Sequence, residues 1–179
     1  MSGHNLRTSL IWAKSAAKVC LIGGVQGEEV VGADTDDPRR PKVASVRVRS
    51  DRVVEVNVRR LVDLDDIEWL NAEVSAALRR AGSGAVICAD YRAASPVPAK
   101  IARVWARGMR KANSEILRSG LLVDPANTMF NLQMERIVRC AINPERRLFT
   151  DLDELNDWIG GVLSEPEREA LGHLFSSSS

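Results

Sequence analysis

The sequence predicts a layered α/β domain with a mixed, mostly parallel sheet of about five strands and amphipathic helices packed on it. Short apolar runs carry this prediction, because each resembles a buried strand and precedes a polar or Pro-containing turn and a helical segment. The runs are Ala85-Val86-Ile87-Cys88-Ala89, Leu121-Leu122-Val123 and Arg147-Leu148-Phe149. Residues 46–49 and 54–58 alternate polar and apolar side chains, which predicts two half-exposed strands joined as a hairpin at one side of the sheet.

Apolar residues at helical spacing predict the helices between and after these strands. The first begins at the aspartates around 63–66, which suit the positive end of a helix dipole, and ends at Gly82. The second, which we expect to be the longest element, follows Ser95-Pro96-Val97-Pro98 and has an apolar face made of Val97, Ile101, Trp105, Met109 and Ile116. The apolar set of the third is less regular and consists of Met129, Leu132, Met134, Ile137 and Val138.

The last predicted unit has the clearest local signals. Thr150 is expected to cap a helix, with Asp153 reaching back to the cap. The buried stripe of this helix is Leu152, Leu155, Ile159, Val162 and Leu163. A short terminal helix is expected from residue 166 to residue 175.

The composition divides the chain into one domain and two tails. Residues 23–41 contain four glycines and five acidic residues, so this stretch buries too little apolar surface to offset the entropy of ordering. We expect residues 1–41 to be a tail that is disordered or loosely docked, residues 42–175 to be the α/β domain, and residues 176–179 to be a low-complexity tail.

Charge and cysteine usage narrow the function classes. A net charge of +1 gives no general attraction to nucleic acid, and no apolar run approaches the length of a membrane span. The odd set Cys20, Cys88 and Cys140 at wide spacing argues against a disulfide framework and favours a reducing cytoplasm. Neither histidine has an acid or cysteine at metal-ligand spacing, so we expect no metal, no cofactor and no catalytic cluster.

Asp90 is the first candidate for a binding site. It stands at the carboxyl end of the predicted central strand, where open α/β sheets place their binding crevices. The alternative is that Asp90 caps the turn or pairs with Arg92. Tyr91, the only tyrosine, is either a ring that stacks on a ligand or a packing residue at the rim.

A row of basic residues at helical spacing is the second candidate. We name the residues Lys100, Arg103, Arg107 and Arg110 the basic stripe; together they could bind an acidic protein partner, a phosphate or an anionic lipid. The alternative is a solvated helix surface. Residues 151–169 hold seven acidic residues and one basic residue, so self-association between surfaces of opposite charge is a further expectation.

The order of the elements resembles that of a STAS-type domain, in particular the bacterial lipid-transfer-like STAS relatives. The segments that carry the resemblance are residues 54–65, 86–92 and 147–159 and the Pro-opened helix with Trp105. The resemblance implies a non-enzymatic signalling module that docks a partner and, in some relatives, holds a nucleotide or an apolar ligand. Classical members of the family carry a phosphorylatable serine in an Asp-Ser-x-Gly segment at the start of the helix after the central strand. This chain reads Asp90-Tyr91-Arg92-Ala93-Ala94-Ser95-Pro96 there, which leaves Ser95 as a positional stand-in.

These observations lead to one expected function and one alternative. The expected function is a non-enzymatic cytoplasmic module for protein–protein interaction in bacterial signalling or regulation, acting through a partner or a second copy. The alternative is a lipid or small-anion binding protein with a crevice near the carboxyl end of the central strand.

Overall fold

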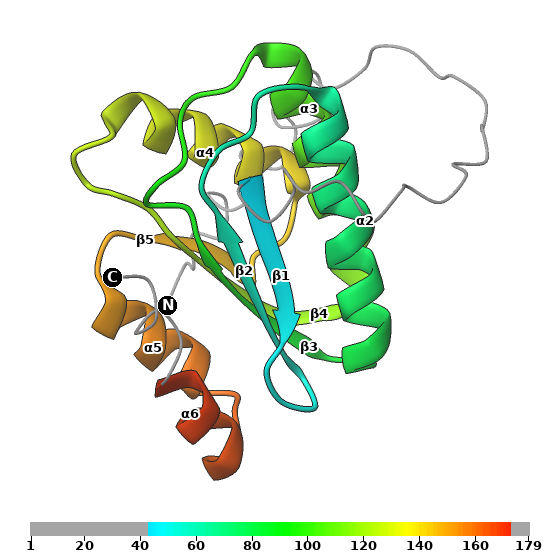
Figure 1. Cartoon of the computed structure of the whole chain (residues 1–179). Helices are drawn as coiled ribbons and strands as arrows, with labels where there is room; N and C mark the ends of the chain where they lie inside the picture. Colours follow the sequence, from blue (N-terminus) through cyan, green and yellow to red (C-terminus); the bar gives the residue numbers. More distant parts are fainter. Residues whose placement is uncertain (1–42, 173–179) are drawn as a thin grey trace, which may run out of the picture. The chain divides into compact units, whose positions relative to one another are not determined.

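The computed structural model describes residues 43–172, which form a five-stranded sheet with helices on both of its faces (Figure 1). The strands follow each other across the sheet in chain order: β1 (Ala44–Val48), β2 (Val53–Val58), β3 (Ala85–Asp90), β4 (Ile116–Leu122) and β5 (Arg146–Phe149). β1 is antiparallel to β2, and all later neighbours are parallel. The predicted fold class is confirmed. The tails expected at 1–41 and 176–179 lie outside the described residues.

The helices divide into two groups. Right-handed crossover connections between successive parallel strands place the connecting helices on the same side of a sheet. The three crossover helices of this domain accordingly pack in one core against one face of the sheet. They are α2 (Leu64–Ala81), α3 (Ala99–Lys111) and α4 (Thr128–Ala141). The opposite face packs against α5 (Leu152–Gly160) and α6 (Glu165–Gly172). The two faces of the sheet therefore carry different helix layers.

The alternation of side chains along each strand explains both cores. On β2, Val54 and Val56 point to the helix layer α2–α4, whereas Val53 points to α5 and α6. β3 is buried along its whole length and lies between β2 and β4, as expected for a strand covered on both faces. Cys88 on this strand is fully buried, and burial raises the pKa of its thiol to about 12.

Side-chain caps fix where α2, α4 and α5 begin, and Asn127 supplies the cap of α4. Asp63 accepts a hydrogen bond of 2.9 Å from the backbone N–H of Asp66 at the start of α2. α5 begins after Asp151, which accepts hydrogen bonds from the N–H groups of Asp153 and Glu154. The prediction that Thr150 caps this helix was wrong by one residue.

Two predicted apolar faces also need correction. α3 ends at Lys111, and a short 3-10 turn at Ala112–Ser114 leads into β4, so Ile116 belongs to a strand and not to the second helix. On α4, Met129 and Leu132 are exposed, and the buried side chains are Phe130, Met134, Ile137 and Ala141.

An arginine–tryptophan stack lies where α5 covers β4 and β5. The guanidinium groups of Arg118 and Arg147 lie 3.8 and 3.6 Å from the centroid of the Trp158 ring. Arg118 also donates a hydrogen bond of 2.6 Å to the backbone carbonyl of Trp158. These contacts attach α5 to the edge of the sheet through cation–π attraction and a charged hydrogen bond.

Candidate functional site

Asp90 ends β3 as predicted, but its carboxylate is occupied by its own neighbour. Its Oδ1 accepts hydrogen bonds of 3.0 Å from both the backbone N–H and the Nε of Arg92, and its Oδ2 accepts one of 2.7 Å from the same guanidinium. The Asp90 side chain is almost completely buried. The sequence left two interpretations of Asp90 open. In the structure Asp90 caps the turn and forms an ion pair with Arg92.

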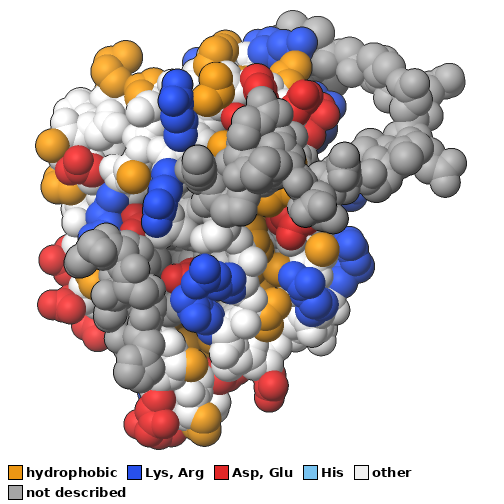
Figure 2. Space-filling view, in the orientation of Figure 1, with side chains coloured by type: hydrophobic (Ala, Val, Ile, Leu, Met, Phe, Trp, Pro, Cys, Tyr) orange, Lys and Arg blue, Asp and Glu red, His pale blue; other side chains and the backbone are white. Residues whose placement is uncertain are grey.

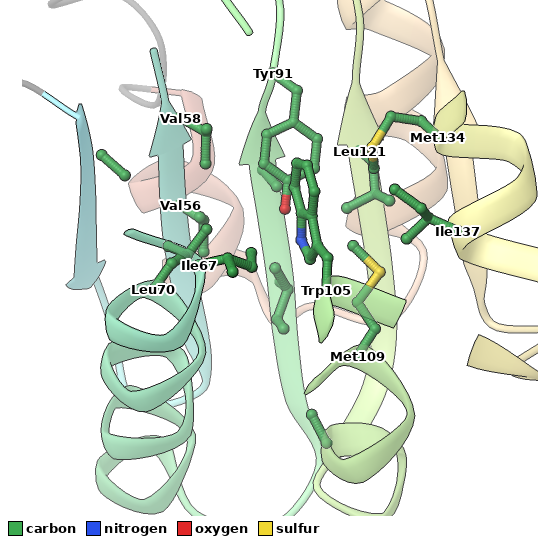
Figure 3. Close-up of a cluster of buried hydrophobic side chains, with 14 of the residues drawn as sticks. Val56, Val58, Ile67, Leu70, Tyr91, Trp105, Met109, Leu121, Met134 and Ile137 are labelled. Atoms are coloured by element: carbon green, nitrogen blue, oxygen red, sulfur yellow. The ribbon is translucent and has the colours of Figure 1, made fainter. Parts of the chain in front are cut away.

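Tyr91 packs inside the domain. Its ring meets Trp105 edge-on at 5.2 Å between centroids, and Figure 3 shows its hydroxyl oxygen beside the indole nitrogen of Trp105. Burial raises the pKa of the Tyr91 hydroxyl, so the group stays protonated at physiological pH. Tyr91 is therefore a core residue and not a ring at the rim of a crevice.

Two amide side chains, one from the N-cap of α4 and one from α4 itself, hold the loop that follows Tyr91. Asn127 donates a hydrogen bond of 3.0 Å to the carbonyl of Ala94. Gln133 accepts one of 2.8 Å from the N–H of Val97 and donates one of 2.7 Å to the carbonyl of the same residue. The exposed Ser95 lies between these two attachments, so the loop presents it in a defined position.

The basic stripe runs along the exposed side of α3, opposite its buried residues Ile101, Trp105 and Met109. Lys100, Arg103 and Arg107 form no ion pair with any residue from 43 to 172. The fourth member differs, because the guanidinium of Arg110 donates to the carbonyl of Cys140 at the end of α4. Arg110 thus joins the end of α3 to the last turn of α4.

The neighbouring helix, α4, carries exposed arginines that were not among the predicted site residues. Arg136 and Arg139 on α4 are exposed, and neither forms an ion pair with a described residue. Met129 and Leu132, 70% and 57% exposed, lie on the same helix. The spacing of Arg136 and Arg139 by three residues was the signal that could have revealed them as one face.

Negative charge is concentrated on the other side of the sheet. The exposed acidic residues of α5, α6 and their caps are Asp151, Asp153, Glu154, Asp157, Glu165 and Glu169. Figure 2 shows acidic side chains gathered over these two helices, at the lower left of the view. The basic stripe and this acidic surface belong to helix layers that cover opposite faces of the sheet.

A small cavity lies between the sheet and helices α2 and α3, with a volume of about 40 Å³. Its walls are mostly apolar, with polar side chains from Asn71, Ser75, Tyr91, Ser119 and Arg146. Pockets for organic ligands usually measure roughly 300–1,000 Å³, so a lipid chain or a nucleotide does not fit here. Of the predicted site residues, Tyr91 lines this cavity, whereas Asp90 lines neither this cavity nor the open hollow between α5 and α6.

Comparisons with protein-family models, with curated proteins and with solved structures find no match for this chain. Within residues 43–172, no three His, Cys, Asp or Glu side chains come together in a way that could hold a metal ion. None of the helices described is both long and apolar enough to cross a bilayer. What the structure defines is a mixed α/β domain with a basic helix surface and an acidic one.

Proposed function

We propose that this domain is a non-enzymatic, STAS-like interaction module of a bacterial signalling or regulatory system, and that it binds an acidic protein surface through α3 and α4. The single observation that carries the proposal is the exposed row of Lys100, Arg103 and Arg107, which has no acidic partner among the described residues. Unpaired cations on a rigid helix attract an acidic surface and orient it on approach.

Exposed apolar side chains beside the cations support a protein partner. Met129 and Leu132 on α4 expose 70% and 57% of their surface, and α4 is the neighbour of α3 in the helix layer. Protein interfaces combine a few buried apolar anchors with a polar and charged rim. A partner with acidic residues around an apolar patch would complement this surface.

A second copy of the chain offers such an acidic surface. The exposed carboxylates of α5 and α6 lie on the far face of the sheet, so a contact between them and the basic stripe would join two different surfaces. Contacts of this kind are heterologous and generate rings or open chains, not closed two-fold dimers. Self-association through these surfaces would therefore depend on concentration and be weakened by salt.

Charge reversal of the basic stripe tests the proposal. The double variant Arg103→Glu/Arg107→Glu should lose the partner in affinity purification from the source cells, and it should lose any salt-sensitive assembly seen by size-exclusion chromatography with light scattering. The matched control is Arg59→Glu/Arg60→Glu, which reverses two exposed arginines outside α3 and α4. Circular dichroism confirms that both variants are folded. A partner that binds the Arg103/Arg107 variant as well as the unmodified protein would contradict the proposal.

A further inference from the structure

Arg146, the first residue of β5, is buried without a counter-charge. Only 5% of its surface is exposed, and it forms no ion pair with any residue that the structure describes. Its guanidinium donates hydrogen bonds of 3.1 Å to Asn113 Oδ1 and 3.2 Å to the carbonyl of Met109. Both acceptors are neutral, and a guanidinium has further N–H groups to satisfy.

The charge of Arg146 cannot be removed by deprotonation. Burial lowers the pKa of its guanidinium, but arginine starts so far above physiological pH that it stays charged. Burying an isolated cation removes its hydration and is strongly unfavourable unless an anion or polar groups compensate the charge. The surroundings of Arg146 must therefore supply compensation beyond two neutral acceptors.

The cavity described above adjoins this residue. Arg146 lines it together with Ser119, which is its register partner on β4, and with Tyr91. The hydroxyls of Ser119 and Tyr91 can both donate a hydrogen bond, and Tyr91 remains protonated because it is buried. No aspartate or glutamate is among the residues that line the cavity.

The size of the cavity restricts what could occupy it. A cavity needs roughly 10–15 Å³ of free volume to hold one water molecule. A cavity of about 40 Å³ therefore has room for a small ion or for a few waters, but not for an organic phosphate. We propose that it binds a small monovalent anion of the size of chloride, held by the Arg146 guanidinium and by the hydroxyls of Tyr91 and Ser119.

Thermal unfolding with exchange of the anion tests this site. Sodium chloride is substituted for sodium gluconate at constant total sodium, because gluconate is too large for the cavity. The melting temperature should rise with chloride, since a ligand that binds only the folded state stabilises it. Tyr91→Phe and Ser119→Ala each remove one donor and should weaken the apparent chloride affinity by roughly tenfold, the effect of one lost hydrogen bond to a charged group.

The control is Arg147→Met, which removes the next arginine along the chain, an exposed residue stacked on Trp158. This variant should keep the full chloride dependence. Crystals soaked in bromide should show an anomalous peak beside the Arg146 guanidinium. Equal melting temperatures in chloride and gluconate, or waters in place of bromide in the cavity, would overturn the assignment and leave Arg146 compensated by water alone.

Discussion

Glu167 on α6 accepts two hydrogen bonds of 2.9 Å from the guanidinium of Arg52, a residue 115 positions earlier in the turn between β1 and β2. The carboxylate also accepts hydrogen bonds of 2.8 Å from the backbone N–H and the hydroxyl of Ser164. Bidentate arginine–carboxylate pairs are both strong and directional. This pair attaches the last described helix to the turn between β1 and β2, near the start of the described residues.

The Arg52–Glu167 pair predicts a loss of stability in acid. The hydrogen bonds from Arg52 lower the pKa of Glu167 to about 2, from an ordinary value of 4.5. A depressed pKa in the folded state stabilises the fold fully above the unfolded value, so this contribution should disappear as the pH falls from about 4.5 to about 2. Glu167→Gln should lower the free energy of unfolding by about 1–3 kcal/mol at neutral pH, measured by urea denaturation.

The difference between Glu167→Gln and the unmodified protein should shrink over the same acidic range. Glu165→Gln is the matched control, because its pair with Arg168 is solvent-exposed and such pairs contribute little. If the two proteins differ by the same unfolding free energy at about pH 7 and at about pH 3, the ionisation of Glu167 does not stabilise the fold.

The start of α5 predicts a contrast between adjacent residues. Asp151 accepts hydrogen bonds of 2.9 and 3.0 Å from the N–H groups of Asp153 and Glu154. Asp151→Ala should therefore cost about 0.5–2 kcal/mol of unfolding free energy. Thr150→Ala should change it by less than about 0.5 kcal/mol, because Thr150 is exposed and does not cap the helix. Thermal denaturation compares the two variants. Equal losses of stability would show that Asp151 is not the residue that caps α5.

The orientation of α4 predicts a second contrast. Met134 is fully buried, so Met134→Ala should lower the free energy of unfolding by about 2–5 kcal/mol. Leu132 is 57% exposed, so Leu132→Ala should lie within about 0.5 kcal/mol of the unmodified protein. Urea denaturation measures both changes. A large loss for Leu132→Ala would mean that the helix is rotated and that Leu132 is not available to a partner.

Close contact between β4 and α5 predicts that Gly120 cannot carry a branched side chain. A Cβ atom on Gly120 would lie 3.2 Å from Leu155 Cγ and from Ile159 Cγ1, both fully buried. Gly120→Val would add methyl groups to this contact and should cost about 1–3 kcal/mol of unfolding free energy. Leu117→Val, at an exposed position of the same strand, is the control and should have little effect in thermal denaturation. Unchanged stability of Gly120→Val would show that α5 packs less tightly.

The fold could be predicted where the local pattern and the tertiary environment agree. The continuous apolar run of β3 marked a strand buried on both faces, and the alternation in β1 and β2 marked the hairpin. The half-exposure that the alternation predicted for β2 was wrong, because β2 is buried on both faces. The prediction failed at Ile116, because it continues the helical period of Met109 although the chain leaves the helix at Lys111. It also failed on α4, whose apolar residues lie on two faces, so that only packing decides which face is buried.

The candidate site divides in the same way. The exposed basic stripe could be predicted from spacing alone, because it lies within one helix. The pairing of Asp90 with Arg92 is also local, and it was one of the two interpretations that the sequence allowed. Arg146 could not be found, because its burial depends on α3 and β4, which contact it only in the folded domain. In the sequence it is one of two arginines that follow a turn.

The packing of α5 and α6 on the second sheet face has a consequence for synthesis. Val53, Val86, Cys88 and Leu122 point toward helices that leave the ribosome only after all five strands. During translation, the apolar side chains on this face of the nascent sheet therefore stay exposed until residues 152–172 have been synthesised and cover them. Chaperones would have access to this face in that period.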